Sequence, residues 1–114
     1  MLRKIPVSGA FHTKLMRPAK EPFIQALKNI ELHKPNVPVY SNVTSKPYNN
    51  VDDIKRNLPQ QIISPVKWEQ TMHVLYKRSQ GTAFPRTFDV GSNGTLKTIL
   101  NHVNAKACES CILV

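Results

Sequence analysis

Residues 86–103 read RTFDVGSNGTLKTILNHV, and this stretch carries the clearest signal for the fold. Its first part, residues 86–91, is rich in aromatic and β-branched residues, which is typical of a strand. Gly91 and Gly94 then mark a turn, and apolar residues follow three or four apart, as the buried side of a helix requires: Leu96, Ile99, Leu100 and Val103. A strand followed by a turn and a helix is the unit from which parallel sheets are built. We therefore predict an α/β fold, with parallel strands joined by helical crossovers.

A helix is predicted between residues 14 and 30. Its apolar residues recur three or four apart, which indicates one buried side: Leu15, Met16, Ala19, Phe23, Ala26, Leu27 and Ile30. Pro18 and Pro22 are tolerated only near the start of a helix. We therefore expect a turn at residues 14–17 and regular helix mainly after about residue 20.

Two further helices are predicted before residue 86. Asn50 is a good capping residue for a short helix that would close near Pro59. The pair Ser64-Pro65 is a second start signal, because proline fits the first helical position. The helix that it begins would run until Gly81, with three apolar side chains on its inner side: Trp68, Met72 and Leu75.

Strands are scarcer than helices. The stretch VPVYSNVTS, residues 37–45, predicts a short buried strand, and the apolar run before His12 looks like the end of another. Together with residues 86–91, that gives two or three strands, a meagre core for a parallel sheet. We therefore predict that residues 1–114 are one segment of a larger α/β domain and are incomplete as a stand-alone fold.

The net positive charge of the chain favours an acidic binding partner. The chain has 114 residues and a formal net charge of +9, from sixteen Lys and Arg against seven Asp and Glu. The basic residues are spread along the chain without a polybasic block, so nucleic-acid binding rests on charge alone and is not favoured. No apolar stretch approaches the roughly 18 residues of a membrane span, and we expect no membrane contact. The start of the chain lacks a secretory signal and is a poor transit peptide.

Cys108 and Cys111 form a C-x-x-C pair at the end of the chain. A zinc site would need a second pair or suitably spaced histidines, and His102 does not have that spacing. We therefore expect no metal. The last four residues, CILV, fit a loose prenylation pattern without an adjacent basic cluster, and we attribute this match to chance.

His12 is the candidate for chemistry, because it follows a strand-like run and precedes a helix. A serine nucleophile on an elbow usually occurs as G-x-S-x-G, and this pattern is absent from the sequence. On spacing alone, a structural histidine explains His12 as well as a catalytic base does.

Four blocks in the sequence resemble one family of enzymes. In order along the chain they are PVSGAFHTKLMRPA (6–19), PVYSNVT (38–44), QQIISPVKWEQTMHVLY (60–76) and FPRTFDVG (84–91). Their order and gaps are similar to the C-terminal part of malonyl-CoA:acyl carrier protein transacylases, especially the mitochondrial form of animals. The resemblance covers nearly the whole chain and weakens after Gly91.

The resemblance implies a fold and a set of site residues. The chain would be the closing section of the large hydrolase-like subdomain of an acyltransferase. His12 would be the general base for malonyl transfer through a seryl ester. The main-chain carbonyl of Gln61 would hold its ring in the useful tautomer, and Asn42 would support the site. Trp68 and Met72 are expected in the core.

The resemblance also implies substrates, partners and a location. Malonyl-CoA would be the substrate, acyl carrier protein the partner and the mitochondrion the location, in fatty acid synthesis. No bound cofactor is expected, and no residue of this chain can be assigned to binding one.

Several parts of the family's domain have no counterpart in this sequence. The nucleophile elbow, the arginine that binds the malonyl carboxylate and the ferredoxin-like subdomain are absent, except for a last strand that would lead into Pro6. The resemblance therefore predicts that the isolated chain is inactive and could pair with a complementary N-terminal segment. The family's V-G-P-G turn is also altered, because Ser92 and Asn93 replace its proline and second glycine.

One alternative function stays open at this point. The excess positive charge would also suit a non-catalytic module that binds acidic acyl carrier protein without performing the transfer.

Overall fold

The computed structural model describes residues 6–114 and divides the chain into two compact units. The first extends to Lys67, and the second spans Trp68–Val114. Each unit is described separately below. The predicted last strand of a ferredoxin-like subdomain, leading into Pro6, lies outside the described residues. Residues 6–10 hold no strand, and the chain bends at Ser8 and Gly9 before the turn that contains His12, so the described part of the run before His12 is not the strand end that its sequence suggested.

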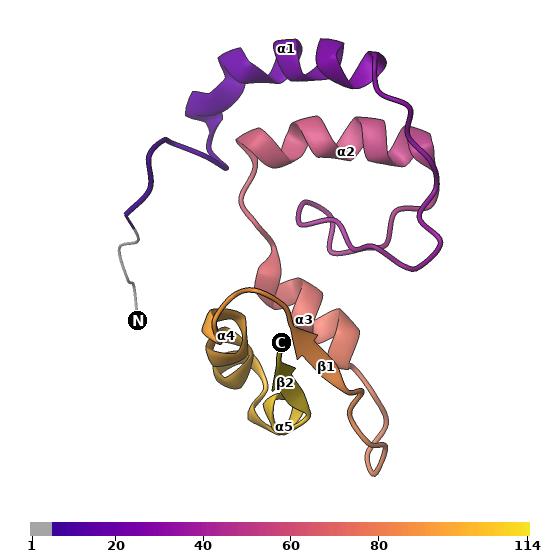
Figure 1. Ribbon diagram of the computed structural model, residues 1–114, viewed down its shortest axis with the longest axis vertical. Helices are drawn as coiled ribbons and strands as arrows, with labels where there is room; N and C mark the ends of the chain where they lie inside the picture. Colours follow the sequence, from indigo (N-terminus) through magenta and orange to yellow (C-terminus); the bar gives the residue numbers. More distant parts are fainter. Residues whose placement is uncertain (1–5) are drawn as a thin grey trace. The chain divides into compact units, whose positions relative to one another are not determined.

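The first unit is built on two helices that pack side by side, α1 (Arg17–Lys28) and α2 (Val51–Ile63) (Figure 1). A short 3-10 helix, η1 (Lys14–Met16), precedes α1 and confirms the predicted turn. The α-helix begins earlier than expected because Pro18 occupies its first turn, where a missing N–H costs nothing. Its buried side is narrower than the sequence pattern suggested. Leu27 is buried, whereas Leu15 and Ile30 are exposed.

The α2 helix begins where predicted and ends later. The side chain of Asn50 accepts a hydrogen bond from the main-chain N–H of Asp53 at 2.8 Å, which caps the first turn. The predicted end near Pro59 is wrong, because the helix continues to Ile63. Pro59 removes one helical hydrogen bond, but it is among the most buried side chains of the described chain, so packing offsets part of that loss.

The strand predicted at residues 37–45 is wrong. This segment makes only an isolated antiparallel bridge between Tyr40 and Pro47, with turns between them. Within the turn, the hydroxyl oxygen of buried Ser41 accepts a hydrogen bond from the main-chain N–H of Val43 at 3.2 Å. Local bonds of this kind compete with the regular ladder of a sheet.

The second unit contains the sheet. Its elements are α3 (Trp68–Tyr76), β1 (Thr87–Asp89), α4 (Thr95–Val103), α5 (Ala105–Glu109) and β2 (Cys111–Leu113). The two strands are parallel, with Phe88 opposite Ile112, and α4 and α5 form the connection between them (Figure 1). This arrangement confirms the predicted α/β class with parallel strands and a helical crossover.

A small core holds the second unit together. Met72 and Tyr76 of α3 pack against Leu100 of α4 and against the buried residues of α5 and β2, with Trp68 packed against this cluster. The core position expected for Met72 is confirmed, whereas Trp68 is half-buried at the edge of this core. The hydroxyl groups of Tyr76 and Thr87 also share a hydrogen bond of 2.6 Å, which ties α3 to β1.

Three predictions for the second unit need correction. The helix predicted from Ser64-Pro65 to Gly81 is shorter, because residues 65–67 are not helical and α3 runs only from Trp68 to Tyr76. Its predicted inner residue Leu75 is exposed. Ile99, predicted to be buried, is 38% exposed. The tail after residue 103, for which no structure was predicted, forms α5 and β2.

The altered turn after β1 forms a helix start of its own. The carboxylate of Asp89 accepts hydrogen bonds from the Ser92 hydroxyl at 2.6 Å and from the Lys97 main-chain N–H at 3.0 Å. The Ser92 hydroxyl oxygen accepts in turn from the Leu96 N–H at 3.1 Å. The helix α4 begins at Thr95 with Gly94 as its N-cap residue, and the Ser92 hydroxyl and the Asp89 carboxylate satisfy N–H groups of its first turn.

None of the helices in residues 6–114 is long and apolar enough to cross a membrane. The same residues contain no group of three or more His, Cys, Asp or Glu side chains placed to hold a metal ion. Cys108 and Cys111 are both buried free thiols.

Candidate active site

His12 lies against the C-terminal end of α2. The last four carbonyl groups of an α-helix have no partner within the helix and must be satisfied from outside. The main-chain N–H of His12 donates to the carbonyl of Ile62, with 2.9 Å between nitrogen and oxygen. His12 adopts a left-handed backbone conformation, with φ of 62°. Histidine is among the residues that are enriched in this uncommon conformation.

The side chain of His12 makes the second contact with the same helix end. Its Nδ1 lies 2.7 Å from the main-chain oxygen of Gln61. A carbonyl oxygen can only accept a hydrogen bond, so Nδ1 must carry the proton. The neutral ring therefore presents Nε2 as an acceptor, which is the state that a general base requires.

Thr13 fixes the turn that carries His12. Its hydroxyl donates to the carbonyl of Ala10 at 2.7 Å, and the same oxygen accepts from the N–H of Leu15 at 3.3 Å. Thr13 is thus the capping residue of η1. Thr13 therefore fixes the turn through its own hydrogen bonds, and the two hydrogen bonds of His12 hold the same turn against the end of α2.

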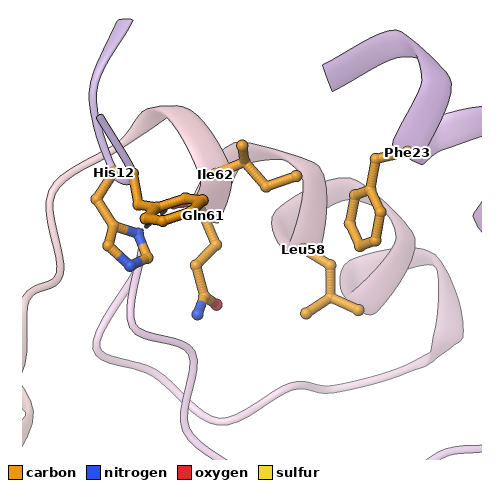
Figure 2. Close-up of a pocket in the computed structure, with 6 residues that line it drawn as sticks. His12, Phe23, Leu58, Gln61 and Ile62 are labelled. Carbon is orange, nitrogen blue, oxygen red and sulfur yellow. Dashed lines mark hydrogen bonds between the residues drawn. The ribbon is translucent and has the colours of Figure 1, made fainter. Parts of the chain in front are cut away.

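A pocket of about 230 Å³ opens beside the histidine. Figure 2 shows Leu58, Gln61 and Ile62 along α2, with His12 beside the helix end and Phe23 opposite. Phe11 completes the lining, which is mainly apolar. None of the six lining residues is a serine, a cysteine or a lysine, so the lining offers one imidazole ring, one amide and apolar walls.

Asn42 has a different position. It does not line the pocket, and its main-chain carbonyl accepts a hydrogen bond from the N–H of Lys67 at 2.8 Å. The Ser45 hydroxyl donates to the Lys67 carbonyl at 3.2 Å. These bonds hold the segment that leaves α2. The supporting role of Asn42 stays a prediction, and the contacts that the structure gives it are made by main chain.

Sequence reasoning missed part of the site. The Ile62 carbonyl, which holds the His12 main chain, had no signal in the sequence, because any residue supplies a carbonyl. In the sequence, Phe23 and Leu58 could be recognised only as apolar residues of two predicted helices, and nothing indicated that they line a pocket. Their convergence on His12 depends on how α1 and α2 pack.

The comparisons with known proteins define the class of the chain. No family model matches it. A solved malonyl CoA-acyl carrier protein transacylase from Coxiella burnetii has the same fold over 96% of this chain, with a TM-score of 0.80 and 26% sequence identity, and the match covers 33% of that chain. The chain is therefore an α/β segment of an acyltransferase.

Curated relatives give the family. A probable mitochondrial malonyl-CoA-acyl carrier protein transacylase from Drosophila melanogaster is 52% identical over 109 residues, which is 96% of this chain and 29% of the relative. The human mitochondrial enzyme of the same name is 53% identical over 108 residues, 95% of this chain and 28% of the relative. The chain belongs to the malonyl-CoA-acyl carrier protein transacylases and corresponds to a C-terminal portion of them. It spans less than a third of the length of these relatives.

Proposed function

We propose that this chain supplies the general base of a malonyl-CoA:acyl carrier protein transacylase, and that His12 is that base. One observation carries the proposal: the 2.7 Å contact between Nδ1 of His12 and the Gln61 carbonyl leaves Nε2 as the acceptor. A histidine held in this tautomer by a fixed carbonyl is suited to proton abstraction, and the pocket beside it leaves room for reacting groups.

The chemistry would proceed in two transfers. A serine from the remaining portion of the enzyme attacks the malonyl thioester, Nε2 takes its proton, and the departing CoA thiolate receives that proton as the C–S bond breaks. In the second transfer, His12 removes the proton of the carrier protein's phosphopantetheine thiol, the thiolate attacks the seryl ester, and His12 returns the proton to the serine oxygen as the C–O bond breaks. Partial negative charge at the end of α2 stabilises the positive charge that develops on the ring in both steps.

The proposal includes substrates, partner and location. Malonyl-CoA is the acyl donor and acyl carrier protein the acceptor, because both appear in the names of the relatives. The fruit fly and human relatives are named mitochondrial, so we propose the same compartment and a role in fatty acid synthesis. No bound cofactor takes part in this scheme.

The isolated chain is proposed to be inactive. Its sequence contains no G-x-S-x-G elbow, and the arginine that would pair with the malonyl carboxylate belongs to the same absent portion. A general base contributes about 10²–10⁴ in rate only when a nucleophile is present to use it. Without the serine, the covalent route does not exist.

The test uses a chimera in which this chain replaces the aligned portion of the human relative. We expect His12→Ala to lower kcat for malonyl transfer by about 10²–10⁴ while the melting temperature changes little. His33→Ala is the matched control, because His33 is exposed and its Nε2 lies 3.4 Å from the Glu31 carboxylate, which is itself exposed. Unchanged transfer by the His12→Ala chimera would exclude the proposed role.

The basic module remains the second candidate, motivated by the net charge of +9. It predicts that the isolated chain binds acyl carrier protein and that binding weakens as salt is raised. Lack of binding at low ionic strength, where a contact driven by charge is strongest, would remove it.

A further inference from the structure

Cys108 and Cys111 are two free thiols for which the proposed function has no use. Cys108 lies at the end of α5, and Cys111 is the first residue of β2, which follows α5 directly (Figure 1). A zinc site would need further ligands, and residues 6–114 contain no group of three or more His, Cys, Asp or Glu side chains placed to hold a metal ion. The chemistry left for this C-x-x-C pair is the interconversion of thiols and a disulfide.

The main chain brings the two cysteines close together. Glu109 is still helical, and Ser110 has φ of −88° and ψ of 7°, which are values of the second central residue in a type I turn. The first and last Cα atoms of such a turn lie less than about 7 Å apart. A disulfide requires Cα atoms about 4.4–6.8 Å apart, so the turn from Cys108 to Cys111 suits a bridge between them.

The two side chains also share one core. Cys108 is 9% exposed and Cys111 is 4% exposed, and both belong to the buried cluster that contains Leu100 and Ala107. The Cys108 thiol donates to the Lys97 carbonyl at 3.5 Å, and the Lys97 ammonium donates to the Cys111 carbonyl at 2.6 Å. One residue of α4 thus contacts both cysteines and brings a positive charge beside them, as is typical of reactive thiols.

Access to the thiols depends on β2. In the described residues this strand is three residues long and pairs with β1 alone. The side chains of Ile112 and Leu113 are 44% and 53% exposed, so few apolar contacts hold the strand in place. Segments with few buried contacts open locally at a small free-energy cost. Opening of β2 would uncover both sulfur atoms to a small solute while α3 and α4 stay folded.

We propose that Cys108 and Cys111 form a redox-active dithiol that hydrogen peroxide converts to an intramolecular disulfide. Cys108, the more exposed of the two, reacts first. Its thiolate attacks one peroxide oxygen, the O–O bond breaks, and the departing hydroxide takes the thiol proton and becomes water. Cys108 is then a sulfenic acid.

Cys111 completes the reaction. Its thiolate attacks the Cys108 sulfur, the S–S bond forms as the S–O bond breaks, and the departing hydroxide takes the Cys111 proton as a second water. The two sulfur atoms are oxidised and the peroxide is reduced. A dithiol reductant reverses the change by thiol–disulfide exchange. Neither step involves His12, so the inference goes beyond the proposed function and can be tested without malonyl transfer.

The test uses the chimera with the N-terminal portion of the human relative. The folded chimera is treated with hydrogen peroxide, its remaining thiols are alkylated, and trypsin then cleaves after Lys106 to release residues 107–114, which contain both cysteines. We expect this peptide to carry no alkyl group and to weigh two hydrogen atoms less than its dithiol form. Reduction with dithiothreitol before alkylation should restore two alkylated cysteines.

The same chimera unfolded in urea is the control, because its thiols are then open to the oxidant. Two alkylated cysteines in the folded chimera, under peroxide that oxidises the pair in urea, would show that they are inert core residues and would overturn the inference. A disulfide from either cysteine to a different cysteine would overturn it as well. Both measurements use the unsubstituted pair, so they do not depend on whether a variant folds.

Substitutions separate the two steps. In Cys111→Ser the second thiol is missing, so Cys108 should accumulate as the sulfenic acid, which dimedone traps as an adduct on the peptide. Cys108→Ser should give less adduct in the same time, because Cys111 is the less exposed thiol. Equal or greater adduct on Cys111 would overturn the assignment of Cys108 as the residue that reacts first.

Discussion

At the scale of single residues, His12 combines a structural contact with the proposed chemical one. Its main-chain N–H and its Nδ1 satisfy two neighbouring carbonyls at the end of α2 that no residue within the helix can reach. Both contacts fix the position of the ring, and the second also fixes the tautomer. The structural and the catalytic explanations of His12 are thus compatible, because the bonds that anchor the residue are the ones that prepare Nε2.

Because His12 contacts the main-chain carbonyl of Gln61, the effect of replacing the Gln61 side chain can be predicted. In the chimera, Gln61→Ala should change kcat by less than about tenfold, because the carbonyl that holds the His12 ring remains in place. His12→Ala, measured beside it, should lose far more. If Gln61→Ala matched the loss of His12→Ala in steady-state malonyl transfer, the glutamine side chain would take part directly and the main-chain explanation would be wrong.

Little of this site could be predicted from the residues alone. The spacing around His12 was compatible with a base or with a structural residue, and the family resemblance pointed to the base. The Gln61 carbonyl came from the same resemblance, and the structure contains that contact. The bond from the His12 N–H to Ile62 could not be predicted, because it is made by groups that every residue carries and depends on the packing of a loop against a distant helix.

At the scale of elements, periodic apolar residues predicted helices better than local composition predicted strands. The helix after His12 and the helix after Gly91 both formed where the spacing indicated. The strand predicted at residues 37–45 failed because a β-branched composition is a weak preference, and the Ser41 side chain in that segment satisfies the main chain locally. The short strand β2 was overlooked, since three residues beside a C-x-x-C pair carry little pattern.

The first turn of α2 allows a prediction about acid stability. The side-chain hydrogen bond from Arg56, followed by the main-chain N–H of Asn49, holds the pKa of Asp53 below its usual value of 3.8. A carboxyl group with a lowered pKa stabilises the folded chain above the pKa of the unfolded state. That contribution disappears as the pH falls through the folded value.

Asp53→Asn should therefore lower the melting temperature by a few degrees at pH 7. The difference from the unsubstituted chain should shrink as the pH falls below 3.8, where the unfolded chain binds the proton first, and disappear as the pH falls through the lowered pKa of folded Asp53. Asp52→Asn is the matched control, because Asp52 lies in the same turn and is exposed. Thermal melts across this pH range would contradict the explanation if the Asp53→Asn difference stayed constant.

At the scale of the whole molecule, the sequence predicted the fold class and the partial nature of the domain. An α/β arrangement with parallel strands and a helical crossover is confirmed in the second unit. The sheet in the described residues has two strands, of which only β1 was predicted, because the strand expected at residues 37–45 did not form and β2 was not expected. The division at Lys67 and Trp68 was not predicted, because no linker composition marks it and the boundary follows from contacts formed only after folding.

The proposed base and the missing nucleophile can be tested in one assembly experiment. The isolated chain should give no malonyl transfer, and adding the N-terminal portion of the human relative should restore it to a measurable rate. His12→Ala should leave assembly intact and lower the maximal rate by about 10²–10⁴, because the serine loses the base that takes its proton. Transfer by the isolated chain above the enzyme-free background would contradict the missing-nucleophile argument, and an unchanged maximal rate for His12→Ala would contradict the role of the base.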